Sequence, residues 1–297
     1  MNKWKWNQFG EIQNISELEE YLYGREYGHG HYFHYTNLGS IEKILEGKSF
    51  RISNVQVFND QKERKVFGNE EHLYFSLCFS TGINENLPLW YLYSGLKGDG
   101  GRVGFTKSSI RKLIENSEYE LIQLDEDRKK QVGDAICSLK ENDTMRSVFK
   151  DVIYFGKDDH DKMYLKYNTM TNHKISNNEI EKLKTNMKGF CKSLIWFYEK
   201  ETRLLIKVTG DAAKKIDVKK NYAILMQFDE KLRDSIYVTF APEIDDIQKA
   251  IADKKAIQSH MLKTSRIDES RYKGEIKMKL CDYCIKNTPS NGNPTGK

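Results

Sequence analysis

The residues best suited to catalysis alternate along one short segment: Glu199, Glu201 and Arg203. Apolar runs at 194–198 and 204–206 flank them, so the sequence predicts a strand near the interior. Alternate residues of a strand point to one face, which brings the three charges together. Two carboxylates this close repel unless a cation lies nearby, and we expect Arg203 to supply it by pairing with Glu199. The alternative is an ordinary salt bridge on a solvated strand face.

An aromatic segment near the start of the chain carries a second candidate pair, His34 and Thr36. The segment 32–35 predicts a strand, so both side chains would lie on the same face. An imidazole and a hydroxyl placed in this way can hydrogen-bond a ribose diol. The alternative is a packed strand whose histidine is satisfied by the backbone.

A third candidate is the aromatic pair Trp90 and Tyr93, which share a face at helical spacing. Such rings form either part of the core or a platform for a ligand. Glycines within 98–101 follow the pair and invite a phosphate-loop interpretation. No Gly-Lys-Ser/Thr follows these glycines, however, so we reject a P-loop.

Residues that could bind a metal are sparse. Cys281 and Cys284 have the spacing of half a zinc knuckle, but no second pair of ligands lies nearby. The clustered His29, His31 and His34 would be separated by strand alternation. We therefore expect no metal, and a zinc-stabilised nucleic-acid binder remains the less favoured alternative.

Composition narrows the class of protein. No apolar run approaches the ~18 residues of a membrane helix, and segment 1–6 lacks the apolar stretch of a signal peptide. We expect a cytoplasmic protein with reduced cysteines and no membrane partner. The net charge of +5 permits an anionic partner without requiring one. Basic stretches at 128–130, 214–215 and 219–220 are compatible with nucleic acid or with plain solvated surface.

The hydrophobic pattern predicts a single α+β domain over residues 1–285, with a mostly antiparallel sheet. Strands are expected at 32–35, 49–53, 73–80, 102–105, 222–228, 236–240 and 274–280, and a helix is expected at 244–256. The charged segment 108–190 predicts a helical insertion, because apolar residues recur within it at helical spacing. The polar, turn-rich tail 286–297 is expected to be disordered.

These stretches occur in an order that resembles a known family. The motifs are His34-Tyr35-Thr36-x-Leu38, Arg51-Ile52-Ser53-Asn54, Phe58-Asn59-Asp60-x-x-Glu63, Cys78-Phe79-Ser80, Trp90-x-x-Tyr93, Gly101-x-Val103-Gly104-Phe105 and Glu199-x-Glu201-x-Arg203. From about residue 31 to 280, the chain resembles the DUF2971 family of bacterial and phage proteins. It departs from that family at Gln61, where the family usually has proline.

The DUF2971 family is similar to the ADP-ribosyltransferase superfamily, including its DNA- and RNA-directed toxins. The resemblance implies an ADP-ribosyltransferase-like split sheet with flanking helices and a cleft that holds NAD as substrate. It also implies a toxin or phage-defence effector that transfers ADP-ribose to RNA, DNA or protein, with an antitoxin or inhibitor protein as a possible partner. An NAD glycohydrolase, or an inactive NAD- or nucleic-acid-binding protein of the same fold, is the alternative.

The resemblance also implies roles for the reactive residues. It makes Glu201 the catalytic carboxylate and Glu199 its partner. Such a carboxylate would stabilise the positive charge that develops on the ribose as nicotinamide leaves. Tyr93 becomes the ring that stacks on nicotinamide, although Trp90 or Tyr74 could serve instead.

The remaining expected contacts are to the cofactor. His34 and Thr36 are expected on the adenosine-side ribose. Arg51 is expected on the pyrophosphate, because a guanidinium presents a fork of donors to anionic oxygens. Asn59 and Asp60 would shape the loop beside it. The full set of cofactor-binding residues expected is His34, Tyr35, Thr36, Arg51, Asn59, Asp60, Trp90 and Arg203.

Overall fold

A computed structural model of the chain describes residues 5–82, 84–93, 100–242, 248–261 and 266–273. Within these ranges the strands form two sheets. The larger sheet contains β1 (His31–Asn37), β2 (Ser49–Asn54), β3 (Tyr74–Thr81), β4 (Gly100–Thr106), β5 (Glu118–Leu124), β6 (Cys137–Leu139), β7 (Met145–Asp151), β12 (Glu201–Val208), β13 (Asn221–Gln227), β14 (Tyr237–Phe240) and β15 (Ile267–Glu269). The smaller sheet contains β8 (Ile153–Lys157), β9 (Met163–Tyr167), β10 (Met170–Asn172) and β11 (Cys191–Ser193).

Helices connect and cover these strands. The α-helices are α1 (Ile15–Tyr23), α2 (Leu38–Gly47), α3 (Gln61–Lys65), α4 (Leu87–Tyr93), α5 (Lys107–Asn116), α6 (Asn177–Asn186), α7 (Gly210–Ala213), α8 (Glu230–Arg233) and α9 (Gln248–His260). The 3₁₀ helices are η1 (Trp6–Glu11), η2 (Val55–Val57), η3 (Gly68–Leu73) and η4 (Leu194–Glu199). The Asn37 side chain caps α2, where it accepts a hydrogen bond from the backbone N–H of Ser40.

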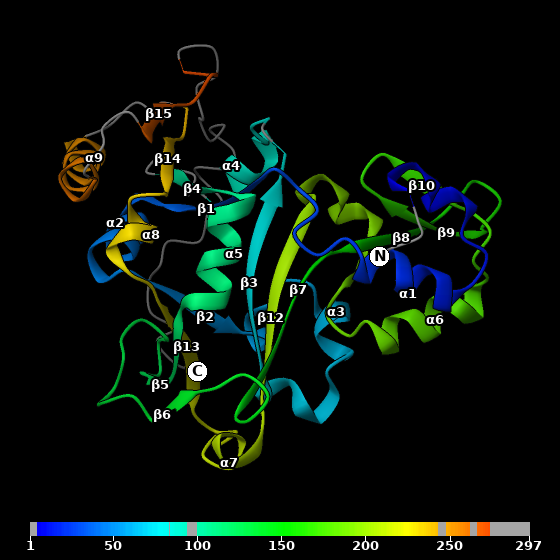
Figure 1. Cartoon of the computed structure of the whole chain (residues 1–297), viewed down its shortest axis with the longest axis horizontal. Coiled ribbons are helices and arrows are strands. Elements are labelled where there is room, and N and C mark those ends of the chain that lie inside the picture. Colours follow the sequence, from blue (N-terminus) through cyan, green and yellow to red (C-terminus); the bar gives the residue numbers. More distant parts are fainter. Residues whose placement is uncertain (1–4, 83, 94–99, 243–247, 262–265, 274–297) are drawn as a thin grey trace, which may run out of the picture.

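The larger sheet forks at β3 (Figure 1). One edge of β3 pairs with β12 over most of its length, and β12 pairs in turn with β7. The other edge pairs with β2 near the start of β3 and with β1 near its end. From there β1 leads to β4, β14 and β15, whereas β2 leads to β13, β5 and β6. Within the larger sheet every described pairing except β14–β15 is antiparallel, and in the smaller sheet β8–β11 is parallel. This confirms the predicted α+β class with a mostly antiparallel sheet.

Strand alternation gives the sheet two different faces around β3. One face is apolar and is covered by α2 and α5, and α5 lies across it in Figure 1. Its buried side chains include Tyr32, Ile41, Leu45, Leu77, Phe79, Ile110, Leu113, Leu204 and Ile206. The opposite face is called the cleft face below. It is defined by Phe33, Tyr35, Cys78, Ser80, Glu201 and Arg203, each one position out of phase with the core residues.

The predicted helical insertion at 108–190 is wrong. This segment contains six strands, β5 to β10, between α5 and α6. The apolar spacing that indicated helix belongs to the two ends, since Ile110 and Leu113 lie in α5 and Ile180 and Leu183 in α6. The strands between them pair partly with β12 and β13, which lie far along the chain, so local periodicity could not reveal them.

Other predictions have mixed outcomes. Six of the predicted strands correspond to β1, β2, β3, β4, β13 and β14, and the helix predicted at 244–256 corresponds to α9. The strand predicted at 274–280, the Cys281–Cys284 pair and the tail 286–297 lie outside the described residues. Within the described ranges, no helix has the length and apolarity needed to cross a bilayer.

Candidate active site

The cleft face borders a cleft of about 190 Å³. Strands β1, β3 and β12 contribute to its lining, together with the segment 57–60, α3, α4, β11 and η4. The cleft therefore gathers residues from four distant parts of the chain. It contains the predicted catalytic residues Glu199, Glu201 and Tyr93 and the predicted loop residues Asn59 and Asp60.

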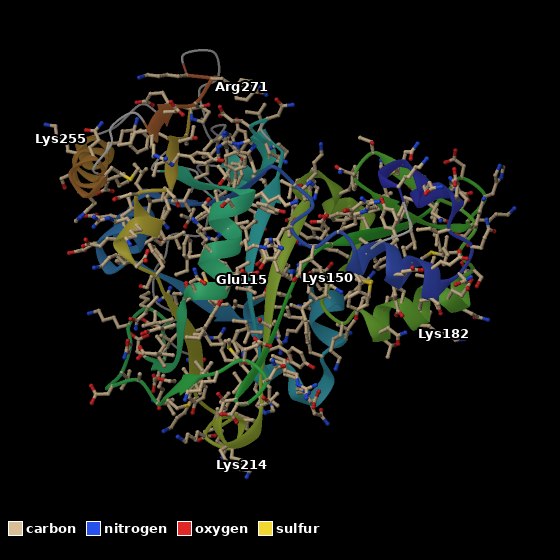
Figure 2. All side chains as sticks on the ribbon, viewed as in Figure 1. Glu115, Lys150, Lys182, Lys214, Lys255 and Arg271 are labelled. Carbon is tan, nitrogen blue, oxygen red and sulfur yellow. The ribbon has the colours of Figure 1, made fainter. Side chains whose placement is uncertain are left out.

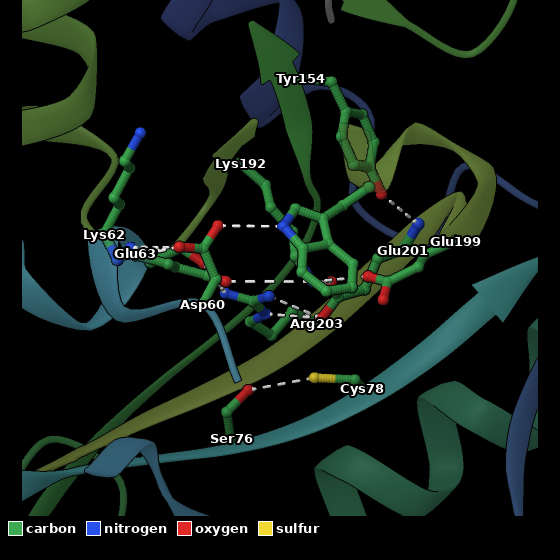
Figure 3. Close-up of polar contacts among 12 residues, drawn as sticks. Asp60, Lys62, Glu63, Ser76, Cys78, Tyr154, Lys192, Glu199, Glu201 and Arg203 are labelled. Carbon is green, nitrogen blue, oxygen red and sulfur yellow. Dashed lines mark hydrogen bonds and ion pairs between the residues drawn. The ribbon is translucent and has the colours of Figure 1, made fainter. Parts of the chain in front are cut away.

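Five charged side chains meet at the cleft: Glu63, Lys192, Glu199, Glu201 and Arg203 (Figure 3). The ammonium of Lys192 donates to Glu199 Oε2 and to Glu201 Oε2, the latter at 3.2 Å, and lies 3.9 Å from Glu63 Oε2. The guanidinium of Arg203 donates to Glu201 Oε1 from Nε at 2.8 Å and from Nη2 at 2.7 Å, and it also binds Glu63. The two cations thus link the three carboxylates into one network.

The backbone between Glu199 and Glu201 differs from the prediction. Glu199 ends η4, and β12 begins only at Glu201. Lys200 lies between them in the left-handed region with φ of 44°, and its carbonyl accepts from Thr81 N at 3.0 Å. The two carboxylates therefore do not alternate along one strand. They converge because both bind Lys192, a residue of β11.

The predicted pairing of Arg203 is also wrong. Its partners are Glu63 and Glu201, whereas Glu199 is held by Lys192. The Arg203 side chain is almost completely buried and also donates to the carbonyl of Gly189. Arg203 is therefore an internal counter-ion that fixes Glu201, not a residue with donors directed at a ligand.

The environment separates the pKa values of the two cleft carboxylates. Burial raises the pKa of Glu199 to about 7, and the charge of Glu201 adds to this effect against the opposing influence of Lys192. Burial acts in the same direction on Glu201, but Arg203 and Lys192 outweigh it and lower the pKa of Glu201 to about 2. Burial disfavours the charged form of Lys192, yet its three carboxylate neighbours raise its pKa. At neutral pH, Glu201 is ionised and Glu199 titrates.

Polar contacts orient the aromatic side chains of the cleft. The hydroxyl of Tyr93 donates to Glu199 Oε1 at 3.0 Å. The indole of Trp196 donates to Asp60 Oδ2 at 3.1 Å, and the Lys192 ammonium lies 5.0 Å from the centroid of its ring. Asp60 also caps α3, the helix that carries Glu63. Tyr93 and Trp196 thus place aromatic rings beside Glu199 and Glu201 in the cleft.

His34 borders the cleft, but its ring belongs to the core face. Its centroid lies 5.8 Å from that of Phe50 and 6.0 Å from that of Phe79, and Nδ1 lies 2.9 Å from the carbonyl oxygen of Cys78. Burial lowers the pKa of His34, which favours the neutral imidazole. Thr36 shares this face and is not among the described residues that line the cleft. The alternative of a packed histidine therefore describes the geometry better than a ribose ligand does.

Two other expected contacts lie away from the cleft. Trp90 is fully buried, and its indole donates to Glu85 Oε2 at 3.1 Å, so it belongs to the core. Arg51 is exposed on β2, where Nη1 donates to the carbonyl of Lys129 at 3.1 Å. It lines a separate pocket. Tyr35 does line the cleft, and its hydroxyl accepts from the backbone N–H of Asn86 and from Nη1 of Arg102.

The cleft residues that sequence reasoning missed include Glu63, Lys192 and Trp196. Glu63 ends one of the motifs quoted above, and its spacing from Asp60 matches a helix cap, so a signal for it existed. Trp196 lies in the apolar run before Glu199. Lys192 carries no motif, and only the pairing of β11 with β8 brings it beneath the two carboxylates.

Metal binding finds no support in the described part of the chain. No cluster of three or more His, Cys, Asp or Glu residues within it could hold a metal ion. The three carboxylates of the cleft are instead bridged by Lys192 and Arg203.

Comparisons of the chain with protein-family models, with curated proteins and with solved structures found no match.

Proposed function

We propose that this protein is an NAD-dependent ADP-ribosyltransferase that breaks the bond between nicotinamide and ribose in the cleft. One observation carries the proposal: three buried carboxylates face two cations, Lys192 and Arg203. When Glu199 is ionised, the excess negative charge favours a positively charged ligand group. The nicotinamide ring of NAD is cationic, and its charge moves onto the ribose as the ring leaves. A preorganised negative site stabilises that developing charge.

The two cleft carboxylates suit different steps because their pKa values differ. Glu201, with its pKa lowered to about 2, stays ionised and stabilises the positive charge on the ribose. The C–N bond breaks, and its electron pair leaves with neutral nicotinamide. An oxygen or nitrogen of the acceptor bonds to the ribose carbon, and its proton passes to Glu199, whose pKa is raised to about 7.

The size and the rings of the cleft support the nicotinamide half of NAD as the bound part. Tyr93 and Trp196 line the cleft, and aromatic faces attract cations. The cleft volume of about 190 Å³ lies below the range of about 300–1,000 Å³ for pockets that enclose most of a drug-sized ligand. We therefore expect the nicotinamide riboside end to occupy the cleft and the adenosine end to extend beyond it.

The acceptor that we propose is a macromolecule, RNA, DNA or protein, modified by a toxin or phage-defence effector under the control of an antitoxin. The basis is the motif order that resembles the DUF2971 family. The basic segments 128–130, 214–215 and 219–220 are all exposed, and the side chain of Lys214 points away from the molecule (Figure 2). Exposed lysines of this kind are compatible with phosphate contacts.

NAD hydrolysis is the second candidate. The raised pKa of Glu199 favours it, because a carboxylate that titrates near neutrality can deprotonate water as well as a macromolecular acceptor. A third outcome is an inactive protein of the same architecture, which would bind NAD without releasing nicotinamide.

The test is incubation of the protein with labelled NAD, with and without cell lysate, followed by measurement of free nicotinamide and of label in RNA, DNA, protein and free ADP-ribose. Nicotinamide release with labelled macromolecule supports transfer, and release with free ADP-ribose alone supports hydrolysis. NAD binding without release in either arm would refute an active enzyme.

The matched variants for this assay are Glu201→Gln and Glu118→Gln. Glu201→Gln should slow nicotinamide release by about 100-fold or more, because it removes the charge that stabilises the ribose cation. Glu118 is an exposed residue of β5, so its substitution should leave release unchanged. Circular dichroism confirms that each variant is folded, and wild-type activity in folded Glu201→Gln would exclude the carboxylate role.

A further inference from the structure

Arg102 of β4 is a buried cation that has no carboxylate partner among the described residues. Only 6% of the Arg102 surface is exposed. Nη1 donates to the Tyr35 hydroxyl at 3.1 Å, and Nε has no hydrogen-bond partner within the described part of the chain. A buried guanidinium with unused donors is costly unless an acceptor completes it. Arg203, which is more deeply buried, shows the contrast, since two carboxylates bind it.

Aromatic rings surround the Arg102 guanidinium. Its Cζ lies 3.9 Å from the ring centroid of Phe33, 5.7 Å from that of Tyr35 and 5.9 Å from that of Trp90. The ring faces stabilise the positive charge, but they cannot accept hydrogen bonds from all the in-plane N–H groups. The site is therefore built to hold the cation while leaving donors for an additional acceptor.

A glycine makes room for this aromatic surround. Gly104 lies opposite Phe33 in the β1–β4 pairing. A Cβ at this position would come within 2.1 Å of the Tyr237 ring, so a larger residue would displace that ring. Because Gly104 has no side chain, the Tyr237 ring occupies this space and packs edge-on against Phe33 with ring centroids 5.7 Å apart. The close packing keeps Phe33, and with it Arg102, in position.

The surround adjoins the proposed active site. Phe33 lies opposite Ser80 of β3, and Ser80 lies opposite Glu201 of β12. All three belong to the cleft face, so the backbone of Phe33 is two strand spacings, or about 10 Å, from the backbone of Glu201. Phe33 and Tyr35 also line the cleft. The carboxylate cluster and Arg102, which lies opposite Tyr35, thus belong to the same face of the sheet.

We propose that Arg102 is the subsite for the pyrophosphate of the dinucleotide whose cationic end lies at Glu199 and Glu201. This inference rests on the proposed function. A guanidinium recognises phosphate oxygens with two parallel hydrogen bonds, and the anion supplies the acceptor that the buried donors lack. The carboxylates of Glu199 and Glu201 and the guanidinium of Arg102 suit the two charged parts of NAD, which are the pyridinium and the pyrophosphate. Arg102 therefore takes the role that the sequence suggested for Arg51.

The test measures binding without turnover. Isothermal titration calorimetry of the wild-type protein with ADP and with adenosine isolates the contribution of the phosphates. ADP should bind at least about 10-fold more tightly than adenosine, given the strength of charge-assisted hydrogen bonds. Arg102→Gln should weaken ADP binding about 10- to 100-fold and leave adenosine binding unchanged. Equal affinities of the wild-type protein for ADP and adenosine would overturn the proposal without any variant.

Two exposed arginines provide the comparison. Arg146→Gln on β7 is the neutral control and should retain ADP binding. A loss in Arg146→Gln equal to that in Arg102→Gln would indicate diffuse electrostatics and overturn the proposal. A loss in Arg51→Gln with none in Arg102→Gln would return the role to Arg51. If Arg102→Gln does not fold, Tyr35→Phe serves as the second variant, because it removes the hydroxyl that accepts from the Arg102 guanidinium. Tyr35→Phe should weaken ADP binding. Unchanged ADP binding in that variant would count against the subsite.

The two proposals fail in different ways. Binding of ADP that depends on Arg102, with no nicotinamide release from NAD, would refute the enzyme and leave the anion subsite intact. Nicotinamide release with an NAD KM unchanged in folded Arg102→Gln would refute the subsite and leave the enzyme intact.

Discussion

Replacing Glu199 with glutamine should stabilise the protein at pH 8 and leave its stability nearly unchanged at pH 5. In the folded protein, burial and the charge of Glu201 raise the pKa of Glu199 from an ordinary 4.5 to about 7. The folded state therefore holds a proton on Glu199 more tightly than the unfolded chain does. The stability from this proton is fully present below pH 4.5 and is lost as the pH rises through about 7.

The size of the effect follows from the same shift. One pKa unit corresponds to about 1.4 kcal/mol, so a rise from 4.5 to about 7 removes at most about 3 kcal/mol of stability by pH 8. Glutamine avoids this loss because it cannot ionise. The favourable contact of the ionised Glu199 with Lys192 is already contained in this shift, because it lowers the pKa against the effect of burial. We expect Glu199→Gln to gain about 2–3 kcal/mol over wild type at pH 8.

Urea unfolding of both proteins at pH 5 and pH 8, followed by circular dichroism, measures this difference. The exposed Glu118→Gln serves as the control and should show no pH-dependent difference. A Glu199→Gln variant that is less stable than wild type at pH 8, or equally changed at both pH values, would refute the description of Glu199 as a buried carboxylate strained by its neighbours.

Two further variants test the network and the placement of the histidine. Lys192→Met should destabilise the protein by about 3–5 kcal/mol at pH 8, because it leaves Glu199 and Glu201 without their shared cation, and by less at pH 5. The partly exposed pair of Lys207 with Glu70 supplies the control, since Lys207→Met should cost under about 1 kcal/mol, and equal losses in urea unfolding would contradict the buried network. His34→Ala should lower stability by about 2–4 kcal/mol through lost packing on Phe50 and Phe79, yet leave NAD affinity by calorimetry unchanged. A folded His34→Ala variant with weakened NAD binding would restore the ribose role.

Local patterns in the sequence predicted much of the sheet. Strands β1 to β4, β13 and β14 follow apolar or aromatic runs bounded by turns, and such runs favour strands wherever they pair. The prediction of a helical insertion at 108–190 was wrong because the strands in this segment depend on distant partners. Strands β5 and β7 within 108–190 are stabilised by β13 and β12, and those partners leave no mark on the segment itself.

The same division holds for the candidate site. The sequence alone determined that Glu199 and Glu201 lie close together near the interior, because they are two residues apart beside apolar runs. Tertiary structure decided their partners, since Lys192 and Glu63 arrive on other elements, and burial beside these charges separates the two pKa values. It also decided which strand residues face the cleft. His34 is one residue out of phase with Phe33 and Tyr35, so its ring faces the core. The β1–β4 pairing buries Arg102 beside Phe33 without a carboxylate among the described residues. Local sequence could not indicate this contact, because the two strands lie far apart in the chain.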